Sequence, residues 1–269
     1  MKKLICPAVL LGCMLLVSLA PASAQAEGEI GIDRSNLTRQ SEAFQEKTLR
    51  DIHALGATWF RDGFSTATPD AIAKFVNEVK LAKQNHLKFL AIVSPTGIDY
   101  DPGYHTVNAS EAFRKACGWG GGSPQISKIN LSKLAQRLRS RLDAVKAANL
   151  SIDAFEIGNE YDWICFNGDV PNGHAATEED WMTAVRGYAH FLKTTATIIH
   201  DPQYFPQARI ITSSPSASPT VVIGGIGRRI TSQTLHVWWR CCGTSMDSIT
   251  WITPAIISTA TARIFTHGT

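Results

Sequence analysis

The sequence predicts an α/β protein in which parallel strands alternate with helices. Its 269 residues are 44% hydrophobic and 18% charged, a globular composition with enough apolar material for a buried core. Short β-branched and aromatic runs alternate with amphipathic helical stripes, a pattern typical of a parallel sheet. No Gly-x-Gly-x-x-Gly follows the first predicted strand, which counts against a dinucleotide-binding fold. The alternation itself fits either a doubly wound sheet or part of a (β/α)8 barrel.

The first half of the mature chain contains three predicted strands and two predicted helices. The first helix ends before Gly56, and the second is predicted from an apolar stripe at helical spacing. Arg61-Asp62-Gly63 follows the second strand. In order, the elements are a strand at 30–32, a helix at 44–55, a strand at 58–60, a helix around Ile72, Phe75, Val76 and Val79, and a strand at 87–93.

The second half begins with a long loop that contains three consecutive glycines, 120–122. A helix then carries leucine and valine at spacings of 3, 4, 4 and 3, and a strand follows at 152–157. Thr177 is a good N-cap for the next helix, which carries three acidic residues in its first turn. A fifth strand is predicted at 208–212, which gives about five recognisable βα strands in total.

Residues 1–26 are predicted to be a secretory signal peptide. Lys2 and Lys3 precede an apolar run that ends in an Ala-x-Ala pattern, with cleavage after Ala24 or Ala26. A membrane anchor and a lipoprotein cleavage box at Cys13 are the alternatives. We therefore expect a secreted or periplasmic protein with no stable membrane span after cleavage.

Charge and cysteine content exclude several classes of partner. The net charge of +3 is small and dispersed, without a basic stripe, so no nucleic acid partner is expected. Four cysteines remain after cleavage, and they lack the Cys-x-x-Cys pairs typical of zinc sites. His105 and His174 have no second ligand at metal-binding spacing, so we expect no metal and no cofactor.

The composition changes abruptly near Pro219. From residue 221 to residue 269 the chain has no Lys, Glu, Asn or Tyr, and the βα alternation stops. One interpretation is a β-rich C-terminal segment, and the other is translation out of frame. We therefore divide the chain into a signal peptide (1–26), part of a barrel (27–219) and an atypical, irregular tail (220–269).

The residues most suited to chemistry end the fourth predicted strand. Phe155-Glu156-Ile157-Gly158-Asn159-Glu160 places carboxylates at the strand's carboxyl end, where parallel α/β folds bind ligands. Strand alternation would put Glu156, Gly158 and Glu160 on one face. Glycoside hydrolysis needs one carboxylic acid and a second carboxylate, and Asn159 could donate to a sugar hydroxyl. The alternative is an ordinary polar turn.

This segment resembles the fourth strand of clan A glycoside hydrolases, which are retaining (β/α)8-barrel enzymes. The matching residues are Asn159-Glu160 with the preceding run 155–158, and 56–62 is similar to the family's second strand. The resemblance covers about residues 29–218 and implies a partial (β/α)8 TIM barrel. It also implies Glu160 as general acid/base, Asn159 as a ligand of the substrate hydroxyl, Arg61 as support for the carboxylates, and an oligo- or polysaccharide substrate.

The chain departs from the family where the second carboxylate is expected. The clan's nucleophile is a Glu that ends strand seven, but no Glu follows Glu179, and the acids beyond the start of the helix that carries Glu179, Asp201 and Asp247, lie elsewhere. Strands six to eight are not recognisable, although His236 is faintly similar to a sixth-strand histidine. We therefore expect a truncated glycosidase with little or no activity.

Aromatic and cysteine residues in the loops complete the predicted site. Trp119, Tyr161 and Trp163 follow strands three and four, where they could stack on sugar rings or pack locally. Cys117 and Cys165 lie in neighbouring loops, so a disulfide between them is expected. Two alternatives to a glycosidase remain: a non-catalytic carbohydrate-binding remnant and an unrelated exported α/β binding protein.

Overall fold

The computed structural model describes residues 29–63, 68–107, 110–118, 121–161, 163–170 and 177–213. The predicted signal peptide, Trp119, His174 and the predicted tail lie outside the described residues. The strands are β1 (Gly31–Asp33), β2 (Trp59–Gly63), β3 (Lys88–Val93), β4 (Ala154–Ile157) and β5 (Arg209–Thr212). The α-helices are α1 (Glu42–Ala54), α2 (Pro69–Gln84), α3 (Glu111–Cys117), α4 (Leu131–Ala147) and α5 (Glu178–Ile199), and short 3-10 turns are η2 (Leu37–Arg39), η3 (Gly97–Asp99) and η4 (Ile126–Lys128).

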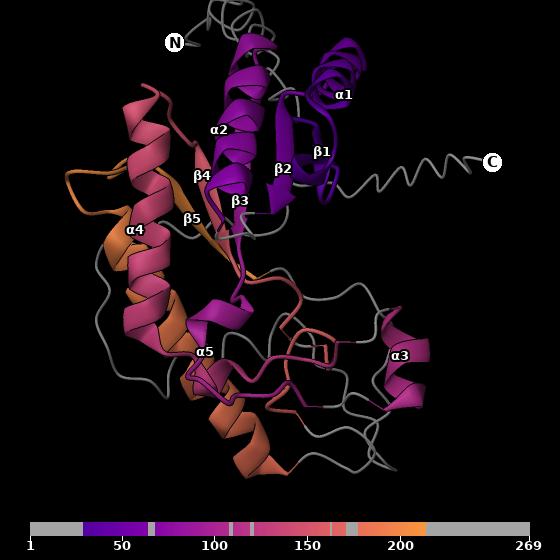
Figure 1. Cartoon of the computed structure of the whole chain (residues 1–269), viewed down its shortest axis with the longest axis vertical. Coiled ribbons are helices and arrows are strands. Elements are labelled where there is room, and N and C mark those ends of the chain that lie inside the picture. Colours follow the sequence, from indigo (N-terminus) through magenta and orange to yellow (C-terminus); the bar gives the residue numbers. More distant parts are fainter. Residues whose placement is uncertain are drawn as a thin grey trace, which may run out of the picture.

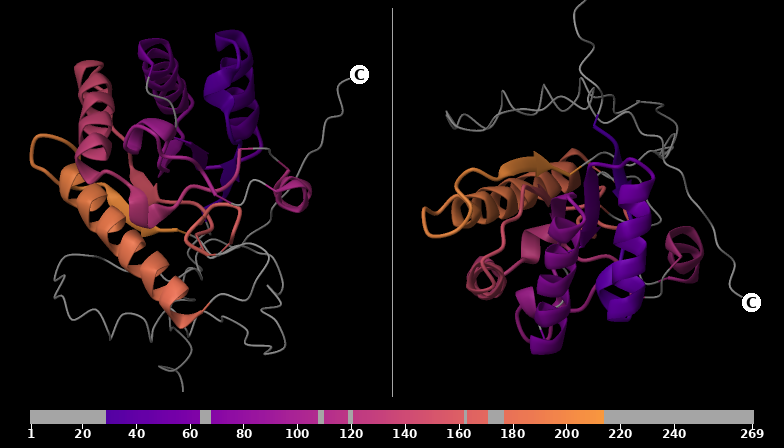
Figure 2. Two further views of the ribbon diagram at one scale, coloured as in Figure 1. Left: turned by 60° about the horizontal axis from the view of Figure 1, so that its bottom comes forward. Right: turned by 90° about the horizontal axis from the view of Figure 1, so that it is seen from above.

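The five strands form one parallel sheet in the order β1-β2-β3-β4-β5. A doubly wound sheet reverses its strand order at a switch point, whereas a barrel adds each new strand beside the previous one. Helices α1, α2, α4 and α5 lie side by side in chain order along one side of the sheet (Figures 1 and 2). This topology is that of a partial α/β barrel, and it resolves the choice that the alternation left open.

The main core fills the space between the sheet and these helices. Phe60, Phe89 and Phe155 project from three adjacent strands toward the helices and are fully buried. The rings of Phe60 and Phe89 meet edge to face with centroids 5.5 Å apart, and Phe75 of α2 packs on Phe89 at 5.6 Å. The leucine and valine stripe of α4 joins the same core. The other face of the strands is therefore left for polar residues at their carboxyl ends.

Local sequence signals place several element boundaries correctly. The Thr177 hydroxyl accepts from the Asp180 N–H, while the Asp180 side chain accepts from the Thr177 N–H, so α5 begins with a capping box.

Two elements differ from the prediction. β2 continues to Gly63, three residues beyond the predicted strand. The long loop predicted before α4 contains the seven-residue helix α3, which is too short for a periodic signal.

None of the helices in the described part of the chain has a stretch long and apolar enough to cross a membrane.

Candidate functional site

A single arginine organises the carboxyl ends of three strands. Arg61 Nε donates to Glu156 Oε2 of β4 at 2.7 Å, and its Nη1 donates to Asp33 Oδ2 of β1 at 2.8 Å. Its Nη2 donates to Asn159 Oδ1 at 2.9 Å. Arg61 thus contacts Asn159, another sequence-predicted residue, and also two carboxylates.

Strand alternation explains why Arg61 can reach its partners. Phe60 and Asp62 point to the helix side of β2, so Arg61 points to the opposite face. The side chain of Glu156 is only 2% exposed and that of Arg61 is 21% exposed, so their ion pair lies largely out of water. Burial alone would lower the pKa of Arg61, but the hydrogen bond and charge of Glu156, with those of Asp33, raise it above its ordinary value. Arg61 is therefore a permanent cation at this site.

The turn that carries the predicted acid departs from strand geometry. β4 ends at Ile157, and both Gly158 (φ 92°) and Glu160 (φ 47°) are left-handed. The expectation that strand alternation runs through Glu160 is therefore wrong, because the chain leaves the sheet before that residue. A side chain at position 158 would also be strained, since an added Cβ would lie 2.5 Å from the ring of Tyr161.

The turn is fixed at both ends by backbone hydrogen bonds. Gly158 N–H donates to the Val93 carbonyl at 2.8 Å, which continues the β3–β4 pairing by one residue. Trp163 N–H donates to the Glu160 carbonyl at 2.9 Å. Glu160 itself is partly exposed at the carboxyl end of the sheet. A glutamic acid held in this way can present its carboxyl group to a ligand.

The amide of Asn159 has a defined orientation. Because its Oδ1 accepts from Arg61 Nη2, its Nδ2 is the end that can donate to a ligand. Asn159 and Glu160 are consecutive in the turn, so a hydrogen-bond donor and a carboxylic acid lie next to each other. That combination suits a polar ligand rich in hydroxyl groups.

The two described aromatic candidates occupy different environments. Tyr161 is 9% exposed and packs edge to face on Tyr188 with ring centroids 5.2 Å apart, so its place is the core beneath the turn. This burial leaves little of its ring for a sugar. Trp163 is half-buried and packs on Phe166 with centroids 5.7 Å apart. Of these two, Trp163 is the one that retains accessible surface beside Glu160.

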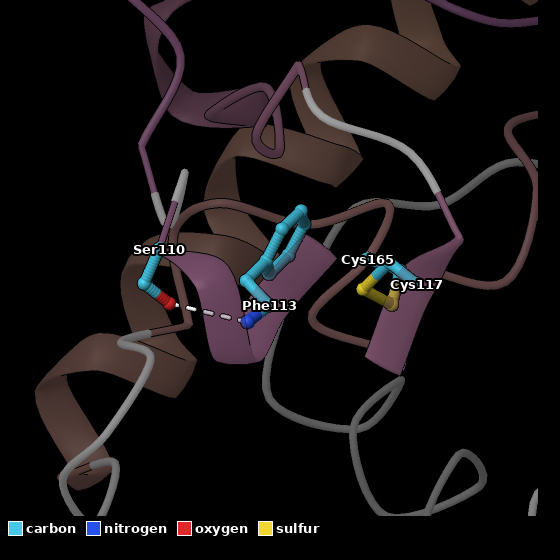
Figure 3. Close-up of a disulfide and its surroundings, with 4 residues drawn as sticks. All are labelled: Ser110, Phe113, Cys117 and Cys165. Carbon is cyan, nitrogen blue, oxygen red and sulfur yellow. Dashed lines mark hydrogen bonds between the residues drawn. A yellow bond between two sulfur atoms is a disulfide. The ribbon is translucent and has the colours of Figure 1, made fainter. Parts of the chain in front are cut away.

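A disulfide joins the loops that follow β3 and β4. Cys117, the last residue of α3, is bonded to Cys165, with their Cα atoms 5.6 Å apart (Figure 3). The pair expected from the sequence is therefore linked in the structure. Phe113 packs with both cysteines in a small buried cluster, and the Ser110 hydroxyl caps α3 by accepting from the Phe113 N–H at 3.1 Å. Half-buried Trp163 lies against this cluster.

No group of three His, Cys, Asp or Glu residues within the described ranges is arranged to hold a metal ion. Asp33, Glu156 and Asn159 are each hydrogen-bonded to Arg61.

Sequence reasoning missed the roles of two acidic residues of this region, Asp33 and Asp62, and the partner of a third, Glu156. Asp33 ends β1 and bonds Arg61, and Glu156 was placed at the strand end without its partner. Asp62 faces the helices, where its carboxylate accepts from the N–H groups of Asn36 (2.7 Å) and Leu37 (2.8 Å). An acidic residue at the end of the first predicted strand was the available signal for Asp33.

No model of a known protein family matches the chain, and no curated protein matches it. Several solved structures do resemble it. One is a structure of fungal β-1,4-galactanases (17% identity, 68% of this chain, 52% of that chain, TM-score 0.42). Another is the endo-1,4-β-D-mannanase of Thermotoga petrophila (11% identity, 68% of this chain, 54% of that chain, TM-score 0.44). A D-allulose 3-epimerase from Methylomonas also matches (11% identity, 69% of this chain, 51% of that chain, TM-score 0.36).

The chain spans about half the length of these three structures. Glycoside hydrolases appear repeatedly among the similar structures. The strand order is that of a partial α/β barrel, and the residues around Arg61 and Glu160 form its candidate site.

Proposed function

We propose that this chain is an exported, carbohydrate-binding O-glycosidase fold of the retaining type with little or no hydrolytic activity. The observation that carries the proposal is the set of hydrogen bonds from Arg61 to Asp33, Glu156 and Asn159, directly beside Glu160. These groups occupy the edge of a parallel barrel-type sheet where substrates of such folds bind.

In this proposal Glu160 is the general acid. A carboxylic acid at this position can protonate the leaving oxygen of a glycosidic bond. Asn159 Nδ2 donates to a sugar hydroxyl, while its Oδ1 is held by Arg61. Trp163, and Trp119 from the preceding loop, would stack on the apolar faces of sugar rings.

The lack of a recognised second carboxylate limits the chemistry. A retaining mechanism needs a nucleophile about 5–5.5 Å from the acid, and no Glu follows Glu179 in the sequence. Glu156 is buried in its ion pair with Arg61, so it is not free to attack a sugar. General acid catalysis alone contributes only about 10²–10⁴-fold. We therefore expect binding of oligo- or polysaccharides with at most residual turnover.

The test compares the purified chain with its Glu160→Gln variant. Hydrolysis is assayed on aryl glycosides and on plant and microbial polysaccharides, and binding is measured by calorimetry with the same polysaccharides. We expect binding by both proteins and negligible hydrolysis. Robust turnover that Glu160→Gln abolishes would show that a nucleophile exists, whereas absence of any binding would contradict the carbohydrate assignment.

Export is a separate part of the proposal. Residues 1–26 would direct the chain to a secreted or periplasmic location, with cleavage after Ala24 or Ala26. N-terminal sequencing of the protein recovered outside the cytoplasm tests this directly. An intact Met1 on the recovered protein would contradict cleavage.

A further inference from the structure

We infer that Tyr188 and Ser213 are positioning residues for Glu160, which they hold by clamping both ends of the turn that carries it. The inference rests on the proposed function, because it gives Glu160 the role of the general acid. Neither residue belongs to the predicted site: Tyr188 lies in α5, and Ser213 follows the last residue of β5.

The first end of the turn is fixed by the Tyr188 hydroxyl. Tyr188 O–H donates to the carbonyl of Ile157, the last residue of β4, at 2.8 Å. The same hydroxyl accepts from Ser213 N–H at 2.8 Å. One oxygen therefore ties the end of β4 to the residue that follows β5 through two partly buried hydrogen bonds.

The second end is fixed by the Ser213 side chain. Tyr161 N–H donates to Ser213 Oγ at 3.1 Å. The backbone N–H of Ser213 thus donates to the Tyr188 hydroxyl, and its side-chain oxygen accepts from the Tyr161 N–H. The three residues between the two anchor points are 158–160, so the candidate acid lies inside a closed circuit of hydrogen bonds.

The geometry of the turn explains why it needs such a clamp. Glu160 is a non-glycine residue with a φ of 47°, a backbone conformation that costs about 1–3 kcal/mol and persists only where its surroundings hold it in place. The Tyr161 ring lies against Gly158 and packs edge to face on the Tyr188 ring. Tyr188 therefore supports the turn through its ring as well as through its hydroxyl.

Two further observations fit a positioning role. Gly187, the neighbour of Tyr188, lets α5 approach η4 closely, because an added Cβ would lie 2.7 Å from the backbone of Ser127 in η4. Burial raises the pKa of the Tyr188 hydroxyl, so the group stays protonated and can donate throughout the neutral range. Helix α5 thus holds a permanent donor at the end of β4.

The experiment uses two variants and one matched control. Tyr188→Phe removes the hydroxyl but keeps the ring, and Ser213→Ala removes Oγ but keeps the backbone N–H. Tyr104→Phe is the control, because the Tyr104 hydroxyl also accepts from a backbone amide, that of Gln125 at 2.7 Å, outside the turn. The ¹³C signal of the Glu160 carboxyl, identified by its loss in Glu160→Gln, is titrated with pH in each free protein. The thermal unfolding midpoint is measured in parallel.

We expect the Glu160 titration curve to shift along the pH axis in Tyr188→Phe and in Ser213→Ala, and to stay unchanged in Tyr104→Phe at a comparable thermal midpoint. Unchanged curves in both variants, or an equal shift in the control, would overturn the inference. If Tyr188→Phe does not fold, Ser213→Ala decides alone. The titration needs no sugar, so failure of polysaccharide binding by the unmodified chain counts against the proposed function and not against the clamp.

Discussion

Arg61 is the residue whose loss should affect the site most. Its guanidinium is the counter-ion of Glu156, which is 2% exposed, so removing Arg61 would leave a buried carboxylate without its cation. The same change would release the side chains of Asp33 and Asn159. Stability and ligand binding therefore depend on the same side chain.

We expect Arg61→Ala to lower the free energy of unfolding by about 3–5 kcal/mol, as is typical when one partner of a buried ion pair is removed. Arg50→Ala is the matched control, because Arg50 pairs with Glu46 on the exposed surface of α1 at 3.2 Å and should cost less than about 1 kcal/mol. Urea unfolding measures both. Similar losses for the two variants would contradict the importance of burial.

The candidate acid could be predicted at the residue scale, but its surroundings could not. Glu160, Asn159 and Arg61 each follow or end a predicted strand, which is a local signal. The bonds of Arg61 to Asp33 and Glu156 span 28 and 95 residues, so they depend on strand order. The left-handed backbone conformation at Glu160 could not be predicted either, because glutamate has no preference for that conformation.

Among the elements, α3 depends most on a covalent link. It has seven residues, fewer than an isolated helix needs, and its last residue is bonded to the segment that follows β4. The disulfide spans 48 residues of sequence, and both cysteines are buried. Its effect should therefore extend from α3 to Trp163, which packs on the same cluster.

We expect the double variant Cys117→Ser/Cys165→Ser to lose about 2–4 kcal/mol of stability, because the open chain gains conformational freedom when unfolded. The comparison is chemical unfolding of the oxidised protein and of the variant, each with and without a thiol reductant. Reductant should destabilise only the oxidised parent. Equal stabilities of parent and variant would show that the bond contributes nothing.

The packing of α2 on β2 depends on a pair of carboxyl groups. Glu78 is fully buried, and burial, together with the charge of Asp62, holds its pKa well above the ordinary range. Burial also raises the pKa of Asp62, although N–H groups of Gly63 and Asn36 and the Glu78 hydrogen bond oppose that rise. Burial and the nearby negative charge of Asp62 therefore favour the protonated form of Glu78.

This pair makes stability depend on pH in a defined direction. A raised pKa in the folded state gives stability that is complete below the unfolded value of about 4.5 and is lost as the pH rises toward the folded value. We expect Glu78→Gln, which keeps a donor but cannot ionise, to be more stable than the parent at pH 7 and to approach it near pH 4. Thermal unfolding between pH 4 and pH 8 measures this, with exposed Glu46→Gln as a control whose difference should stay flat. A flat difference for Glu78→Gln would contradict a raised pKa of Glu78 in the folded protein.

At the scale of the whole molecule, the order of the strands supplies information that local periodicity lacks. Five strands and their alternating helices followed from local periodicity, because each helix has one apolar face and each strand is short and hydrophobic. Periodicity says nothing about which strands are neighbours, so it fits both a doubly wound sheet and a barrel, and only the family resemblance, at the second and fourth strands, favoured the barrel. The order β1-β2-β3-β4-β5 decided between them.

The same order leaves the sheet with two outer strands. Within the described part of the chain, β1 and β5 each pair on one side only. An unpaired strand offers backbone N–H and C=O groups to other chains and promotes association. β5 is the stronger candidate, because Arg209–Thr212 reads Arg-Ile-Ile-Thr and is β-branched at three of its four positions.

We therefore expect the purified chain to associate with increasing concentration, and Ile211→Lys to reduce this association by placing a charge on the outer strand. Leu55→Lys is the control, because Leu55 is a large hydrophobic residue with 66% exposure at the end of α1, so the charge change is the same but lies far from β5. Light scattering over a concentration series compares the three proteins. If both lysine variants reduce association equally, net charge and not the edge of the sheet controls solubility. If only Ile211→Lys does so, β5 is the surface through which copies of the chain meet.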